Sequence, residues 1–252
     1  STVSSAAMLS SLVSKGYIFL LIKIIYRVIG FDIFVNSRII NVLFVFGLAG
    51  MIMGSTSAIR ENDIRRMISY SSVAQIGYIY MGFGLGTSAG MVASVFHILA
   101  HAATKSLLFI SGVGLTDVSG DHKEFIELTG SAYRNVCAGL AFTVGSLSMV
   151  GIPLFSGFIS KLLFSQAAVQ SQLKMLPALI VLAVSTVLNA IYFMKTVIRI
   201  YTPVTSKYES TSMKKNVLYA ATLFCFVALN VGLGMCSQPI TDWITQGLSV
   251  FA

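Results

Sequence analysis

Long, uninterrupted apolar runs constrain this chain more than any other feature of its sequence. A bilayer-spanning helix needs about 20 mainly apolar residues, and eight such windows follow one another along the 252 residues. They cover residues 5–29, 39–59, 67–87, 90–115, 134–152, 154–172, 177–201 and 215–236. These runs are too long and too evenly apolar for the alternating strands of a membrane barrel. The sequence therefore predicts an all-α fold, a polytopic transmembrane helical bundle of about eight spans.

Composition excludes a soluble enzyme. Only 10% of the residues are charged, against roughly 25% in an ordinary soluble domain, and eight spans leave no room for a soluble catalytic domain. We expect residues 1–236 to form one transmembrane domain. The apolar run after Ser237 is too short to span, so we expect residues 237–252 to form a short interfacial tail.

The charge and cysteine patterns argue against nucleic acid and metal chemistry in this chain. The net charge is +8, but the Lys and Arg residues stand singly between apolar runs, which is typical of interface anchors and loop charges. Cys137, Cys225 and Cys236 are far apart and lack the close pairing that zinc or iron-sulfur sites usually take. We therefore expect no nucleic-acid partner, no metal site and no cofactor within this chain.

Acidic and basic residues are distributed differently along the chain. All nine Asp and Glu residues lie in connections, span ends or the tail, whereas Lys15, Lys105 and Lys161 fall within spans or beside a helix break. A charged side chain at the centre of a membrane helix costs at least about 2.5 kcal/mol. Ionisable residues at that depth are functional by default, although Lys15 could instead extend to the interface and Lys161 could mark the end of a span.

One span carries three ionisable residues on a single stripe. His97, His101 and Lys105 follow at i, i+4 and i+8, so each is rotated by about 40° from the last and lies about 6 Å further along the axis. Such a stripe can pass protons, because its groups both load and release them. The alternative is that the histidines only hydrogen-bond neighbouring helices. Three such residues together favour an ion path.

A helix break is expected inside the apolar region that ends at Lys161. Gly151, Pro153 and Gly157 lie within a few residues of one another there, and this combination interrupts a helix or makes a re-entrant turn. Interrupted membrane helices free backbone carbonyls that can contact ions. Lys161 follows the break closely enough to contact such carbonyls.

Three buried lysines without a carboxylate at their depth would be hard to keep charged. Either they rest neutral or the partner lies elsewhere. The chain opens with Ser1 rather than Met, and its first apolar run contains Lys15 and Lys23, unlike a signal peptide. We therefore expect an N-terminal segment missing from this chain, or a neighbouring subunit, to supply a Glu or Asp facing Lys15.

Four segments in order resemble one family of membrane proteins. Residues 64–78 (IRRMISYSSVAQIGY) resemble the signature of the antiporter-like, proton-translocating subunits of respiratory complex I. Residues 97–109 (HILAHAATKSLLF) resemble the histidine and lysine helix of that family, and residues 151–161 (GIPLFSGFISK) resemble its interrupted helix with a terminal lysine. Residues 5–15 (SAAMLSSLVSK) resemble its central broken helix.

The resemblance implies a role for each buried ionisable residue. Lys15 would be the central lysine that pairs with a glutamate on an earlier helix, His97, His101 and Lys105 would be the relay, and Lys161 would lie on the exit side. Family members usually have about fourteen helices, so this chain looks like the C-terminal eight. The span 39–59 departs from the family pattern, because it contains no Lys or His.

The family serves three settings: quinone-reducing complex I, membrane-bound energy-converting hydrogenases and Mrp-type multisubunit sodium/proton antiporters. Our leading hypothesis is a proton-translocating subunit of an energy-converting oxidoreductase, whose iron-sulfur, flavin or nickel-iron centres sit in partner subunits. The alternative is an Mrp-type antiporter subunit that moves sodium ions and protons without redox chemistry. A third reading is a truncated remnant that packs in a complex without conducting. We expect a bacterial or archaeal cytoplasmic membrane rather than the mitochondrial inner membrane.

Overall fold

The computed structural model describes residues 12–203 and 216–251, and the described residues form helices and no strand. The segments are α2 (Ser14–Lys23), the π-helical η2 (Ile24–Ile29), α3 (Phe31–Asn36), α4 (Ile39–Arg60), α5 (Ile64–Gly84), α6 (Ser88–Asp117), α7 (Ser131–Arg134), α8 (Val136–Val150), α9 (Ser156–Gln170), α10 (Met175–Ile200), α11 (Val217–Met235) and α12 (Ser237–Phe251). Each apolar window of the sequence is mostly helical where it is described. The all-α fold class is confirmed.

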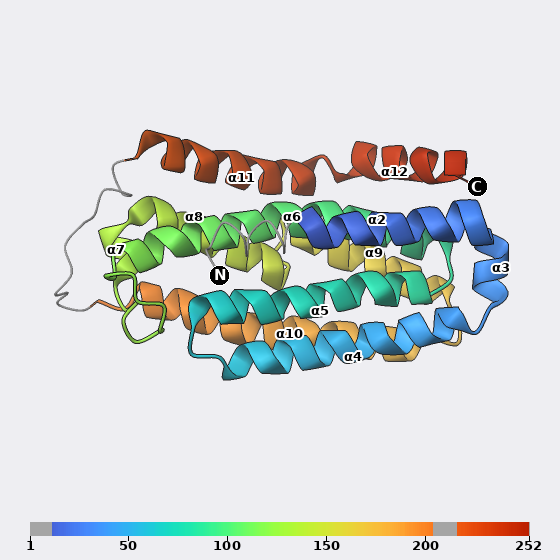
Figure 1. Ribbon diagram of the computed structural model, residues 1–252, viewed down its shortest axis with the longest axis horizontal. Coiled ribbons are helices and arrows are strands. Elements are labelled where there is room, and N and C mark those ends of the chain that lie inside the picture. Colours follow the sequence, from blue (N-terminus) through green and yellow to red (C-terminus); the bar gives the residue numbers. More distant parts are fainter. Residues whose placement is uncertain (1–11, 204–215, 252) are drawn as a thin grey trace.

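The long helices lie side by side along the long axis of an elongated bundle (Figure 1). Among the described residues, α4, α6, α10 and α11 are long and apolar enough to cross a bilayer. The outer helices expose large apolar side chains, including Phe46 on α4, Ile180 on α10 and Phe224 on α11. A surface of this kind faces lipid rather than water. The chain is an integral membrane protein.

Helix α6 forms the centre of the bundle. It has 30 residues, which is about 45 Å of helix. In its most apolar 18-residue window 72% of the residues are buried, against 33% in the corresponding windows of α4 and α10. Figure 1 shows α6 between the other long helices. Its ionisable residues are therefore enclosed by protein on all sides.

Helices α4 and α5 are packed backbone against backbone. Glycines make this possible, because a Cβ at Gly47, Gly54 or Gly77 would overlap the backbone of the facing helix. Small residues at a membrane helix interface allow this close approach, which gives van der Waals contact without a hydrophobic driving force. The pair forms a rigid wall beside α6.

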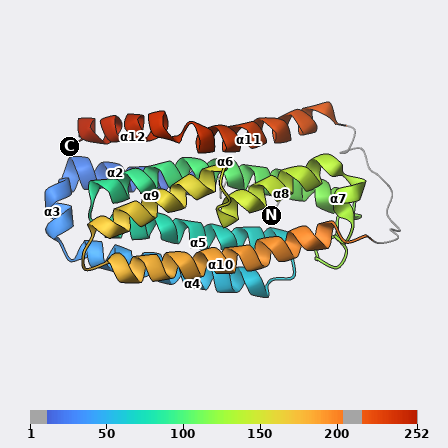
Figure 2. The same cartoon turned by 180° about the vertical axis from the view of Figure 1, so that it is seen from behind.

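Helices α8 and α9 are two halves of one interrupted crossing. Each has 15 residues, about 22 Å, which is shorter than the hydrocarbon core of about 30 Å. They lie end to end, α8 in the half of the bundle near α7 and α9 in the half near α3 (Figures 1 and 2). The windows 134–152 and 154–172 therefore share one passage through the bundle.

The two ends of the described chain lie against the same side of the bundle. Helix α2 begins near the middle of the long axis (Figure 1), and Lys15 is in its first turn. Helix α12 follows α11 end to end, and its Leu248 packs against the cluster formed by Ile18, Ile22 and Ile98. The interfacial position of residues 237–252 stays a prediction. Residues 5–11 of the first apolar window lie outside the described residues.

Candidate functional site

The stripe expected on α6 is buried in the structure. His97, His101 and Lys105 are 5%, 2% and 0% exposed. The two imidazole rings are stacked, with 5.8 Å between their centroids and 10° between their planes. The two rings are thus nearly parallel and lie one turn apart on the buried side of α6.

His97 is held from two sides. Its Nδ1 lies 2.6 Å from Ser160 Oγ on α9, and its ring stacks on Tyr78 of α5 with 5.5 Å between centroids. The other ring nitrogen, Nε2, has no hydrogen-bond partner in the part of the chain that the structure describes. His97 is therefore oriented by one nitrogen and has the other nitrogen available.

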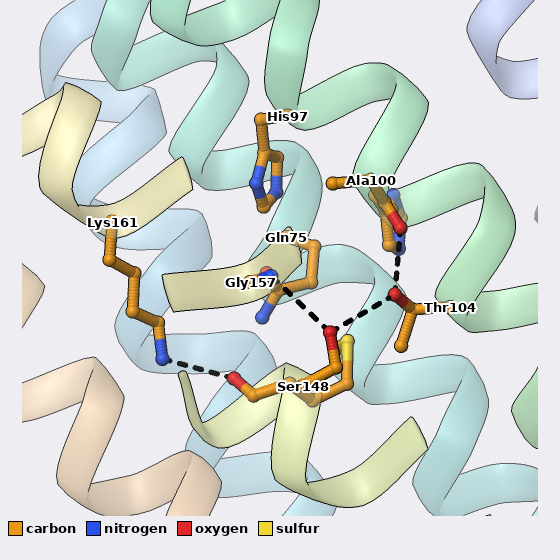
Figure 3. A pocket seen from close by; sticks show the side chains of 9 residues that line it. Gln75, His97, Ala100, Thr104, Ser148, Gly157 and Lys161 are labelled. Atoms are coloured by element: carbon orange, nitrogen blue, oxygen red, sulfur yellow. Dashed lines mark hydrogen bonds between the residues drawn. The ribbon is translucent and has the colours of Figure 1, made fainter. Parts of the chain in front are cut away.

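His101 has two available nitrogens. Neither Nδ1 nor Nε2 has a partner among residues 12–203 and 216–251. Beside it lies a cavity of about 10 Å³, which is close to the least space that holds one water molecule. Figure 3 shows this pocket. It is lined by Gln75, His97, Ala100, His101, Thr104, Ser148, Met149, Gly157 and Lys161.

Lys105 is fully buried and bound to neutral groups. Its Nζ donates to the carbonyl oxygen of Ile68 at 2.7 Å and to Ser71 Oγ, both on α5. A buried ammonium is stabilised by such acceptors, but less than by a carboxylate. No described residue forms an ion pair with Lys105, so no such pair opposes a change of its charge.

Lys161 caps the first half of the interrupted crossing. Its Nζ donates to the carbonyls of Met149, at 3.0 Å, and Val150 at the C-terminal end of α8. These carbonyls have no partner within the helix, and they form the negative end of its dipole. Figure 3 shows the side chain reaching back across the break. This is the contact with freed carbonyls that the sequence suggested.

The break itself needs unusual backbone. Helix α8 ends at Val150, and Gly151 has φ +92°, a conformation that L side chains rarely adopt. Leu154 has φ +88° despite its side chain, so the loop stores strain. Pro153 lies in the loop, and Gly157 follows in the first turn of α9 against the backbone of Ser148.

Hydroxyl and amide groups join the break to α6 and α11. Asn230 of α11 donates to Thr104 Oγ1 at 2.6 Å and accepts from Ser156 Oγ at 3.1 Å. Ser148 Oγ lies 3.5 Å from Thr104 Oγ1 and accepts from the amide of Gly157 at 3.3 Å. The path from Lys105 towards Lys161 is thus lined by neutral polar groups at the point where the helix is interrupted.

Lys161 also faces outwards. A second hollow, of about 590 Å³, lies between α9 and α10 and is lined by Lys161 together with Val150, Gly151, Phe158, Leu162, Ser165, Leu179, Leu182, Ala183, Thr186 and Val187. The same lysine lines the small inner cavity. Lys161 is therefore half-buried, between the centre of the bundle and its surface.

Lys15 is buried in the first turn of α2. Its Nζ donates to Ser14 Oγ at 3.2 Å. As the sequence showed, the span 39–59 offers no Lys or His between Lys15 and the α6 stripe.

Several polar residues of the site were missed from the sequence. Gln75, Ser160 and Asn230 are buried and touch the stripe or the break. Asn230 is a strongly polar residue inside an apolar span, and this alone is a signal of function in a membrane helix. Ser160 gave no such signal, because serine is common in membrane helices. No group of His, Cys, Asp and Glu that could hold a metal ion occurs among the described residues.

Known proteins with similar sequences fall into the settings that the motifs suggested. Residues 1–189 match the family model described as NADH:quinone oxidoreductase/Mrp antiporter, TM. NADH-quinone oxidoreductase subunit N of Rhodococcus opacus is 28% identical over 80% of this chain and 37% of its own length. A putative antiporter subunit, mnhA2, of Staphylococcus haemolyticus is 30% identical over 90% of this chain and 30% of its own length.

A solved structure shares the fold. The membrane-bound sulfane sulfur reductase, an archaeal respiratory membrane complex, contains a chain that is 26% identical, with a TM-score of 0.83 over 96% of this chain and 48% of that one. This chain thus spans less than half the length of each of these relatives. Because the family model covers three quarters of its residues, the chain belongs to the NADH:quinone oxidoreductase/Mrp antiporter transmembrane family.

Proposed function

We propose that this chain is the ion-translocating part of an antiporter-like subunit that moves protons across a membrane. The relay would consist of Lys15, His97, His101, Lys105 and Lys161. One observation carries the proposal: the buried ring of His101 has two unpartnered nitrogens and lies between two further titratable groups of the same helix. An imidazole in this position can accept a proton at one nitrogen and release one from the other.

The surroundings of the relay fit transfer rather than storage of a proton. The hydrogen-bond partners of Lys105 and Lys161 within the described residues are neutral oxygens, so neither lysine is locked in an ion pair there. The cavity beside His101 has room for about one water molecule. Such a water would join His101 to Lys161 across the helix break.

The partners of the chain follow from the same reasoning. The Rhodococcus relative is a subunit of a NADH-quinone oxidoreductase, so our leading proposal is a subunit of an energy-converting oxidoreductase. Iron-sulfur, flavin or nickel-iron centres would then belong to other subunits, and this chain would carry no electron. We also propose that an upstream segment or a neighbouring subunit supplies the carboxylate that pairs with Lys15.

The test is proton translocation by the parent complex in proteoliposomes. We expect Lys105→Ala and Lys161→Ala to lower translocation by at least about tenfold, while the amount of assembled complex stays unchanged. Lys195→Ala is the matched control, because this exposed lysine lies at the end of α10, away from the relay. Wild-type translocation by correctly assembled Lys105→Ala and Lys161→Ala complexes would contradict the proposal and favour a packing role.

A second candidate is a subunit of an Mrp-type sodium/proton antiporter. It is favoured by the 30% identity to a putative antiporter subunit over 90% of this chain. The two candidates separate when redox substrates are supplied and then withheld. Translocation that needs redox turnover supports the oxidoreductase, whereas sodium/proton exchange driven by an ion gradient alone supports the antiporter.

A further inference from the structure

Three side chains with unpaired nitrogens meet at the small inner cavity beside α6. Gln75 of α5 is 2% exposed, as is His101, and His97 is 5% exposed. Within the described residues, Nε2 of Gln75, Nε2 of His97 and both ring nitrogens of His101 have no hydrogen-bond partner. All three side chains line the cavity of about 10 Å³. The proposed relay gives a role to the two histidines and none to Gln75.

The amide of Gln75 is the most informative member of this group. Buried polar atoms are nearly always paired, and leaving one unpaired lowers stability. A histidine can be kept unpaired because it carries protons, but a glutamine side chain does not titrate. Figure 3 shows Gln75 in the pocket together with His97 and Ser148. An unpaired amide that lines a cavity therefore points to a ligand inside the cavity.

The size of the cavity restricts this ligand to one water molecule. A volume of about 10 Å³ is close to the least space that holds a water, and a buried water needs two to four polar partners. Gln75 and the two imidazoles supply three side chains with nitrogens still available for hydrogen bonds. The cavity thus has both the volume and the partners of a water site.

Other polar groups around the cavity are already bonded. Thr104 Oγ1 donates to the carbonyl of Ala100 at 2.7 Å and accepts from Asn230 at 2.6 Å. Lys161 Nζ donates to two carbonyls at the end of α8. The hydrogen bonds that fix the position of a water there come first from Gln75 and the two rings.

The arrangement of the two rings gives such a water a function. They are stacked, with 5.8 Å between centroids and 10° between planes. The N–H bond of an imidazole lies in the plane of its ring, so two stacked, nearly parallel rings do not direct these bonds at each other. A hydrogen bond weakens steeply when the donor hydrogen points away from the acceptor. His97 and His101 therefore need a molecule at their edges to exchange a proton.

One water at that edge transfers the proton with all atoms balanced. When His97 carries hydrogens on both ring nitrogens, its Nε2–H bond breaks and the water oxygen gains that proton. The water gives one of its own hydrogens to a bare nitrogen of His101, where a new N–H bond forms. The water is left unchanged. Because Nε2 of Gln75 only donates, it occupies a lone pair of the water and leaves both water hydrogens for the rings.

We propose that Gln75 is a positioning residue that holds one water molecule against the edges of His97 and His101. It orients this water so that a proton passes from one ring to the other through it. Gln75 itself keeps its hydrogens throughout. The inference rests on the proposed relay, and it names the residue that fixes the water which the relay uses beside Lys161.

The experiment measures proton translocation and thermal midpoint for Gln75→Met in the parent complex. Methionine has a similar length and cannot donate a hydrogen bond. We expect translocation per assembled complex to fall about fivefold, the equivalent of one hydrogen bond, and the thermal midpoint not to rise. Gln75→Leu, which also lacks a donor, should give the same result. In a His101→Gln background, Gln75→Met should lower the rate no further, because the water then has no second ring to serve.

Ile76→Met is the matched control. This half-buried neighbour on α5 packs against another apolar cluster, away from the cavity, so its translocation should equal that of the wild type. An amide that binds nothing would behave differently from our expectation for Gln75, because replacing an unpaired buried amide by an apolar group raises stability. A raised thermal midpoint with wild-type translocation in Gln75→Met would overturn the inference. A loss that multiplies with that of His101→Gln would also overturn it.

The outcome separates this inference from the proposed function. If Lys105→Ala and His101→Gln lose translocation while Gln75→Met keeps the wild-type rate, only the positioning role fails. If Lys105→Ala and His101→Gln both translocate normally, the proposed function fails and the inference fails with it. Loss in all three variants, without a further loss in the double variant, supports both.

Discussion

Two nitrogen-bearing side chains, Arg134 of α7 and His101 at the centre of the bundle, differ in how they are bound. The guanidinium of Arg134 donates to the carbonyls of Val118 and Thr129, at 2.9 and 3.2 Å, and to Ser119 Oγ at 2.8 Å. The imidazole of His101 has no hydrogen-bond partner in the described residues. A polar group with all its hydrogen bonds made holds a loop in place. A buried polar group without partners lowers stability, and a functional role is one reason for a protein to keep it.

The same contrast separates the start of α5 from the middle of the bundle. Where α5 begins, Asp63 caps the helix by accepting from the amides of Arg65 and Arg66, which is an ordinary structural use of a carboxylate. In the middle of the bundle, hydroxyls and amides are arranged around ionisable side chains that could change charge. The stability of the chain and its proposed ion path thus depend on different residues, which can be altered separately.

A large effect on stability should come from the helix break. Gly157→Ala places a Cβ against the backbone of Ser148, and neither partner can move aside without disturbing α8 or α9. Overpacking of this kind costs about 1–3 kcal/mol, so the amount of folded subunit in the membrane should fall several-fold. Gly232→Ala on α11 is the control, because nothing lies within 4 Å of its added Cβ. Equal yields of both variants would show that the break is not tightly packed.

Arg134→Met should separate stability from translocation. The substitution removes three hydrogen bonds to a charged group, each worth about 1 kcal/mol or more, so we expect the thermal midpoint of the complex to fall by about 5–10 °C. Translocation per assembled complex should remain close to that of the wild type. An Arg134→Met complex that keeps its thermal midpoint but loses translocation would contradict the contrast drawn between Arg134 and His101.

Ser160→Ala should have a moderate effect on translocation alone. It removes the hydroxyl 2.6 Å from His97 Nδ1, so the ring loses the contact that fixes its orientation, at a cost of about 1 kcal/mol. We expect a loss of about fivefold in the translocation rate. Ser165→Ala provides the control, since its hydroxyl donates to a carbonyl of its own helix. An unchanged rate in Ser160→Ala would mean that the orientation of His97 is unimportant.

The smallest effect should come from Lys174, which precedes α10 and donates to the carbonyl of Gly84 at 2.6 Å. Burial lowers the pKa of Lys174. At pH values between this lowered pKa and the pKa of the lysine in the unfolded chain, the unfolded chain binds more protons than the folded chain. Stability therefore rises with pH across that range. The thermal midpoint of Lys174→Met should therefore rise slightly less with pH, in the alkaline range, than the thermal midpoint of the wild type. An identical pH dependence in both proteins would show that the group is solvated.

Much of the fold was predictable because the solvent of a membrane protein is lipid. Spans must be helical and apolar, so their positions follow from hydropathy, and each window is mostly helical where it is described. The pairing of helices was not predictable, because a lipid-facing and a buried apolar residue look alike. The two windows 134–152 and 154–172 lie in one interrupted crossing, which hydropathy could not distinguish from two separate spans.

The same limit applies to the site. His97, His101 and Lys105 could be found because ionisable residues at helical spacing stand out in an apolar span. Ser185, Asn189 and Tyr192 also follow at helical spacing on α10, a weaker polar stripe that was not noticed. Which residue binds which, such as Ser160 with His97, depends on contacts between distant segments that periodicity does not encode.

The central claim is that the unpartnered imidazole of His101 carries protons. The most direct test compares His101→Gln with His122→Gln in the parent complex, measuring proton translocation per assembled complex in proteoliposomes. Glutamine keeps hydrogen-bonding capacity but cannot titrate, and His122 is an exposed residue of the connection between α6 and α7. We predict that His101→Gln loses at least about tenfold in translocation with normal assembly, and that His122→Gln loses none. Wild-type translocation by an assembled His101→Gln complex would contradict the account.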